Sequence, residues 1–226
     1  MKEILVESSE QLLMQARALL QRVDGTERAK ELLEVIVARA DGHTWGEAMV
    51  ELSTIATWPD DSELSGQLAA TAVGAANHLI GTRARAAAGV RLAAADYRLG
   101  KSTDLARLET SARTALLEND RYYGALGLRL LGDYLKHSGD KARARVVYEE
   151  SAAAAERHEW LTAAASTLRD LAELEHEEGE TPRAIAHLEQ ALTVIDRHPF
   201  SDALGTGVGR QRTTLAVELA ALRGRT

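Results

Sequence analysis

The residues best suited to chemistry form a short segment, Gly100-Lys101-Ser102-Thr103, that ends like a phosphate-binding loop. Such a loop needs a glycine five residues before its Gly-Lys pair, so that backbone amides can surround the phosphates. Ala95 occupies that position, and the residues before it have helical rather than strand periodicity. We therefore interpret the segment as a turn between helices, with Ser102 or Thr103 as the N-cap.

A second candidate, His176-Glu177, begins like a zinc-protease motif, but Glu180 occupies the place of the second histidine ligand. The seven histidines of the chain are scattered, without paired ligands on one helical face, so we expect no metal site. Carboxylates are frequent between Glu173 and Glu180, but no nucleophile can be assigned beside them. A charge run of this kind is typical of a solvated helix face.

A third candidate is the glycine-rich stretch Gly205, Gly207 and Gly209. Arg210 replaces the last glycine of a dinucleotide fingerprint, and no strand pattern precedes it, so we interpret the stretch as a link before a final helix. After these exclusions we expect no catalytic residue, no metal and no cofactor. The sequence therefore favours a protein that is not an enzyme.

The composition favours an all-helical soluble protein. Hydrophobic residues make up 45% of the 226 positions, which is enough for a core, and aromatic residues make up 4%. Alanine, leucine, glutamate and arginine dominate, and these residues favour helices. Since the chain has no cysteine, disulfides and thiolate metal sites are excluded.

The net charge of -7 works against a nucleic-acid partner, because affinity for phosphates comes mainly from lysine and arginine. Residues 1–6 have no signal-peptide pattern, and no apolar run approaches the ~20 residues of a membrane span. We therefore expect a cytoplasmic protein that binds neither nucleic acid nor membrane.

The elements that carry these residues are predicted to be amphipathic helices joined by short turns. One series of turns lies at Gly42, Gly81, Asp120, Glu159 and Pro199, with spacings of 39, 39, 39 and 40 residues. A second, interleaved series lies at Gly25, Asp60, Gly100, Gly139 and Gly179, with spacings of 35, 40, 39 and 40 residues. Two interleaved series predict helical hairpins stacked about five times, with ten or eleven helices and no strand.

The same helix-turn-helix pattern occurs in residues 121–159 and again in 160–198. In the first copy Leu128, Leu131, Gly132 and Leu135 precede the turn, and Ala144 and Tyr148 follow it. The second copy repeats this pattern with Leu168, Leu171 and Ala172, then Ala184 and Leu188, but has Glu175 where the first has Leu135. Small residues allow two helices to approach closely, and the large residues fill the space beside them.

These residues resemble the tetratricopeptide-repeat (TPR) family, in the long-helix variant found in bacterial regulators. The resemblance implies an all-α fold, a right-handed superhelical solenoid of about five antiparallel helix hairpins plus a C-terminal helix. We expect residues 1–226 to form a single repeat domain, in which 121–159 and 160–198 are the best-matching repeats and 201–226 form a C-terminal capping helix.

In the family that the sequence resembles, the first helix of each hairpin lines a concave groove that binds a protein or peptide. Aligning the repeats assigns ten residues of this chain to that groove: Trp58, Val90, Tyr97, Arg98, Arg129, Asp133, Lys136, Arg169, Glu173 and His176. The expected groove is uncharged and partly aromatic in its N-terminal half and charged in its C-terminal half. It suits a segment with hydrophobic anchors beside charges.

Several interpretations stay open from the sequence. Arg129 with Asp133, and Arg169 with Glu173, have the four-residue spacing of ion pairs within a helix, each worth only about 0.2–0.5 kcal/mol. The protein is predicted to be an interaction adaptor, and the alternative is a regulatory sensor of a peptide or ligand. Homodimers are a further option, through apolar faces on the terminal helices: Leu12, Leu19 and Leu20, or Leu215, Leu219 and Leu222.

Overall fold

The computed structural model describes residues 7–20, 25–40, 42–56, 61–75, 80–201 and 207–224. All regular secondary structure in these residues is α-helical, as predicted. The helices are α1 (Ser9–Leu20), α2 (Thr26–Arg39), α3 (Gly42–Ala56), α4 (Ser62–Gly74), α5 (Thr82–Arg98), α6 (Leu105–Leu117), α7 (Arg121–Ser138), α8 (Lys141–Arg157), α9 (Leu161–Glu177), α10 (Thr181–Asp196) and α11 (Gly207–Arg223).

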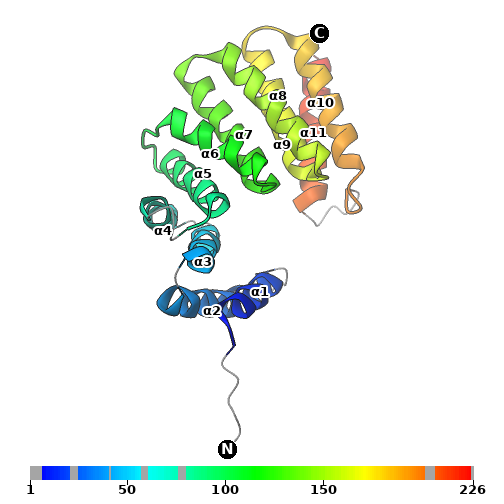
Figure 1. The fold of residues 1–226 in the computed structure, drawn as a ribbon. Helices are drawn as coiled ribbons and strands as arrows, with labels where there is room; N and C mark the ends of the chain where they lie inside the picture. Colours follow the sequence, from blue (N-terminus) through cyan, green and yellow to red (C-terminus); the bar gives the residue numbers. More distant parts are fainter. Residues whose placement is uncertain are drawn as a thin grey trace, which may run out of the picture. The chain divides into compact units, whose positions relative to one another are not determined.

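The helices group into two compact units, residues 1–118 and 119–226, which we call the N-terminal and C-terminal units. In the N-terminal unit, α1 packs on α2, α3 on α4 and α5 on α6, and α2 and α4 each pack on the helix that follows. In the C-terminal unit, α7 packs on α8, α9 on α10, and α11 covers α10 (Figure 1). Each unit is therefore a stack of consecutive helical hairpins, which is the architecture of a helical solenoid.

The predicted turn residues lie at helix ends, except Asp60, which lies outside the described residues. Gly139 follows α7 with φ 89°, and Gly179 follows the C-terminal end of α9 with φ 81°, a conformation that favours glycine. The N-cap of α6, however, is Asp104 rather than Ser102 or Thr103, because the Asp104 carboxylate accepts a hydrogen bond from the Arg107 amide at 3.1 Å. The predicted N-cap was therefore wrong by one or two residues.

In the N-terminal unit one buried carboxylate joins three helices. Glu47 of α3 is 4% exposed, and its carboxylate lies 2.5 Å from Arg17 of α1 and 3.1 Å from Arg83 of α5. The burial of this charge is tolerated because two guanidinium groups compensate it.

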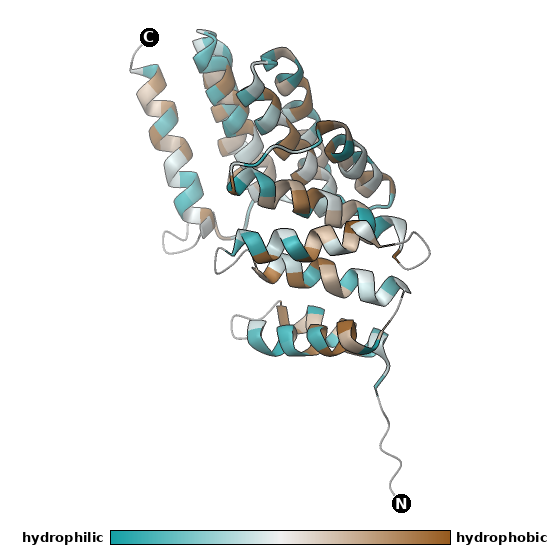
Figure 2. Cartoon of the chain, turned by 90° about the vertical axis from the view of Figure 1, so that its left-hand side faces the viewer, coloured by the Kyte–Doolittle hydropathy of each residue, from teal (hydrophilic) through white to brown (hydrophobic). Residues whose placement is uncertain are grey.

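The alternating hydrophilic and hydrophobic residues along the helices are seen in Figure 2. None of the described helices is long and apolar enough to cross a membrane.

The α7–α8 hairpin depends on the contact between Gly132 and Tyr148. A Cβ atom added at Gly132 would lie 2.5 Å from Tyr148 Cε1, and Tyr148 is only 1% exposed. This confirms that the small residue at position 132 allows the close approach of the two helices, with Tyr148 filling the space beside it.

Replacing Gly132 with alanine is therefore expected to destabilise the protein by about 1 kcal/mol. Alanine in a helix interior ordinarily stabilises by up to about 1 kcal/mol, but overpacking a core costs about 1–3 kcal/mol. Urea unfolding measures the difference. Gly74→Ala is the control, because no atom in the described part of the chain lies within 4 Å of its added Cβ. Stabilisation by Gly132→Ala would contradict the steric argument. In a protein that already carries Tyr148→Leu, adding Gly132→Ala should cost much less than it does in the wild type.

Candidate functional site

The ten predicted groove residues are divided between the two units. Trp58 lies outside the described residues. In the N-terminal unit, Val90 of α5 is fully buried, so it has no surface to offer a partner and we leave it out of the candidate site. Tyr97 and Arg98 lie in the last turn of α5, the first half-buried and the second exposed. The other six predicted residues lie on α7 and α9.

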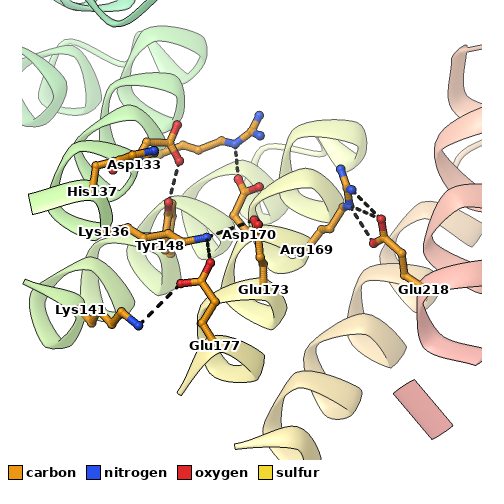
Figure 3. Close-up of polar contacts among 11 residues, drawn as sticks. Asp133, Lys136, His137, Lys141, Tyr148, Arg169, Asp170, Glu173, Glu177 and Glu218 are labelled. Carbon is orange, nitrogen blue, oxygen red and sulfur yellow. Dashed lines mark hydrogen bonds and ion pairs between the residues drawn. The ribbon is translucent and has the colours of Figure 1, made fainter. Parts of the chain in front are cut away.

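Ion pairs join α7 to α9 along their length. Arg129 Nε of α7 lies 2.6 Å from Asp170 Oδ2 of α9. Two turns further along α7, Lys136 Nζ lies 3.2 Å from Glu173 Oε2 and 2.9 Å from Glu177 Oε1 (Figure 3). These contacts come from successive first helices of the hairpins, so they connect neighbouring repeats rather than neighbouring turns of one helix.

A second set of contacts joins α9 to α11. Arg169 donates from Nε to both carboxylate oxygens of Glu218, at 2.9 and 2.8 Å (Figure 3). Toward the other end of α11, Gln211 Nε2 donates to the Thr162 carbonyl oxygen and to Ser166 Oγ, each at 2.9 Å. The helix α11 therefore lies beside α9 as a further first helix. We call the connected side chains of α7, α9 and α11 the first-helix surface.

The predicted alternative of ion pairs within one helix is not what the structure shows. Arg129 pairs with Asp170, whereas Asp133 accepts a hydrogen bond from the Tyr148 hydroxyl at 2.6 Å. Arg169 pairs with Glu218 of α11 rather than with Glu173. Four-residue spacing did not reveal this, because the pairing partners are about 40 to 50 positions away in the sequence.

Asp133 is the most perturbed acid of this surface. Burial raises its pKa to about 6, against the lowering effect of the Tyr148 hydrogen bond, and the nearby Asp170 carboxylate raises it further. Burial also raises the pKa of Asp170, although the Arg129 guanidinium opposes the shift. For both groups the largest cause is desolvation, because burial penalises the charged form of a carboxyl group.

One open pocket of about 280 Å³ brings three predicted residues together, and it lies on α9, α10 and α11. The polar lining is Arg169, Glu173, His176 and Glu218, and the apolar lining is Ala172, Leu188, Ala221 and Leu222. His176 is exposed, and 64% of the Glu173 side chain is exposed. The pocket therefore offers an apolar floor with polar and charged groups at its edge. Part of its lining comes from α11, which the alignment of repeats did not include, so the sequence analysis could not predict the pocket.

A second pocket of about 220 Å³ lies between α7 and the start of α9 and was missed by the sequence analysis. Tyr122 and Trp160 line it with Arg129, and their ring centroids are 4.6 Å apart. Trp160 lies in a turn, outside the helical repeat pattern, so alignment of the repeats did not select it. Because aromatic residues are rare in this chain, Trp160 could have been selected for that reason alone.

The predicted apolar faces of the terminal helices are largely covered. Leu12 of α1 is 6% exposed, and Leu215 and Leu219 of α11 are 0% and 7% exposed. These three leucines are therefore not part of a free apolar face, contrary to the prediction, and the homodimer itself stays a prediction. Leu19, Leu20 and Leu222 are half-buried.

In the described residues, no group of three or more histidine, aspartate or glutamate residues could hold a metal ion.

Comparison with solved structures identifies the class of fold. A thermophilic TPR protein of Thermus thermophilus, TTC0263, matches with a TM-score of 0.58 and 18% identity, over 95% of this chain and 98% of that chain. BtubC (BKLC) from P. vanneervenii matches with a TM-score of 0.56 and 16% identity, over 95% of this chain and 91% of that chain. No family model and no curated protein matches the sequence.

The chain therefore has a TPR-like fold, as the repeated residues predicted. At this level of identity the likeness establishes the arrangement of helices, and the function has to be argued from the surface of this chain.

Proposed function

We propose that this protein is a non-enzymatic adaptor that binds a peptide segment of another protein on the first-helix surface of its C-terminal unit. The observation that carries the proposal is the pocket on α9, α10 and α11, in which Arg169, Glu173 and His176 surround apolar side chains. Recognition of a peptide commonly combines an apolar anchor in a pocket with polar groups at the rim that fix its register.

The charges of this surface favour a particular kind of peptide. Arg169 is already neutralised by Glu218, and Lys136 by Glu173 and Glu177. The acidic groups therefore exceed the basic ones around the pocket. A segment with an apolar side chain next to lysine or arginine would find complementary charges there, whereas an acidic segment would be repelled.

The test is a pull-down from source-cell lysate that compares the wild type with Glu173→Lys. Glu173 is mostly exposed, and Lys136 keeps its pair with Glu177 in the variant, so we expect the fold to be retained. The protein partner retained by the wild type should be lost from Glu173→Lys. The matched control is Glu149→Lys, which changes an exposed glutamate on α8 and should retain the partner.

Equal retention by the wild type and Glu173→Lys would exclude this pocket as the binding site. Loss of the partner from Glu149→Lys as well would indicate a general effect of charge. Reversal of Arg129 or Arg169 is less informative, because each of these residues also holds two helices together.

A further inference from the structure

The N-terminal unit contains a larger and more apolar groove, of about 580 Å³, between α2, α3 and α4. Its apolar lining comes from all three helices: Val37, Ala38, Met49, Leu52, Ile55, Ala56, Leu64 and Leu68. On α2 the lining residues extend from Thr26 to Ala38, which is about 18 Å of helix at 1.5 Å per residue. The groove is thus long enough to contact several successive side chains of a bound segment.

The rim of the N-terminal groove is acidic. Glu27 and Glu34 lie on α2 and Asp61 precedes α4, against one cation among the described lining residues, Lys30. All three acids are exposed. An apolar groove with an acidic rim selects an apolar ligand that also carries positive charge, because the apolar area supplies affinity and the rim excludes anionic competitors.

We propose that this groove binds an amphipathic helical segment of a partner protein, whose apolar side chains are flanked by lysine or arginine. The apolar residues of the segment lie on the floor formed by α3, and its cations lie against Glu27, Glu34 and Asp61. The site is in the N-terminal unit and shares no residue with the pocket proposed above, so either site can fail without the other.

The test uses three fluorescein-labelled synthetic helices of about 14 residues, a length that matches the groove. One has a leucine stripe with lysine on its other positions, the second replaces lysine with glutamate, and the third replaces leucine with alanine. Fluorescence anisotropy measures the Kd for the full chain. We expect the leucine-lysine peptide to bind at least about tenfold more tightly than the other two, because each tenfold step is only ~1.4 kcal/mol.

Two groove variants locate the binding. Leu64→Gln changes a rim leucine that is 40% exposed, and Glu34→Lys reverses an exposed rim charge. Each should weaken binding of the leucine-lysine peptide about tenfold. The matched controls in the same unit are Leu117→Gln, at a leucine that is 87% exposed on α6, and Glu118→Lys, and both should bind as the wild type does.

Unchanged affinity in Leu64→Gln and Glu34→Lys would overturn the proposal, and so would equal binding of the alanine-lysine peptide, which would reduce the effect to charge alone. Failure of the leucine-lysine peptide to bind would also overturn it. A second copy of this chain is the other occupant to test. If sedimentation shows a wild-type dimer that Leu64→Gln dissociates, the groove holds that second copy instead of a partner helix.

Discussion

Arg145→Met is expected to lower the free energy of unfolding by about 3–5 kcal/mol, the range found when one partner of a buried ion pair is removed. Glu175 is 1% exposed, and its carboxylate accepts hydrogen bonds from Arg145 Nε at 2.7 Å and Nη2 at 3.2 Å. These bonds lower the pKa of Glu175. Without the guanidinium, the buried carboxylate would lose its main compensating charge.

The double variant Arg145→Met, Glu175→Leu should recover most of this loss. Leucine at 175 restores the residue type that Leu135 has in the preceding repeat, and a well-packed apolar pair often replaces a buried ion pair without cost. Urea unfolding at neutral pH measures all three proteins. Arg157→Met, an exposed arginine in the last turn of α8, is the control and should cost less than about 1 kcal/mol. A loss of that size for Arg145→Met would contradict the proposed role of the pair.

Asp133→Asn is expected to remove a pH dependence of stability worth about 2 kcal/mol between pH 7.5 and 4.5. The pKa of Asp133 is about 6 in the folded chain, against 3.8 as the ordinary value. The folded state therefore binds more protons than the unfolded state in this range. The contribution of this group to the free energy of unfolding must rise as the pH falls through 6.

The measurement compares urea unfolding of the wild type and Asp133→Asn at both pH values, because the other carboxylates titrate in both proteins and cancel in the difference. Relative to Asp133→Asn, the wild type should gain about 2 kcal/mol on acidification. If the wild type instead lost stability on acidification relative to Asp133→Asn, Tyr148 and Arg129 would stabilise the charged form of Asp133 more strongly than burial opposes it.

The helices and turns of this fold could be predicted because they are determined by local properties. The regular spacing of turns required no long-range information, and Gly139 and Gly179 occupy a backbone conformation that few other residues adopt. The pairing of Gly132 with Tyr148 was predictable because the repeat pattern places a small residue opposite a large one.

The candidate site was predicted less completely, because its geometry depends on contacts between repeats. Alignment correctly located Arg169, Glu173 and His176 on one helix, but Glu218 and Leu222 come from α11, which has no counterpart in the aligned pattern. Glu175 looked like a departure from the motif, and only the position of Arg145 explains it.

The order of charges along the first helices also decides which hairpin can be multiplied. The α9–α10 hairpin offers Asp170 to the preceding arginine and Arg169 to the following acid. If a second copy of this hairpin were inserted after it, Arg169 of the first copy would lie beside Asp170 of the second, as Arg129 lies beside Asp170 now. The α7–α8 hairpin has Leu130 at the position of Asp170, so its duplicate would leave an arginine facing leucine. Of these two hairpins, α9–α10 is therefore the one whose charges are compatible with its own duplicate.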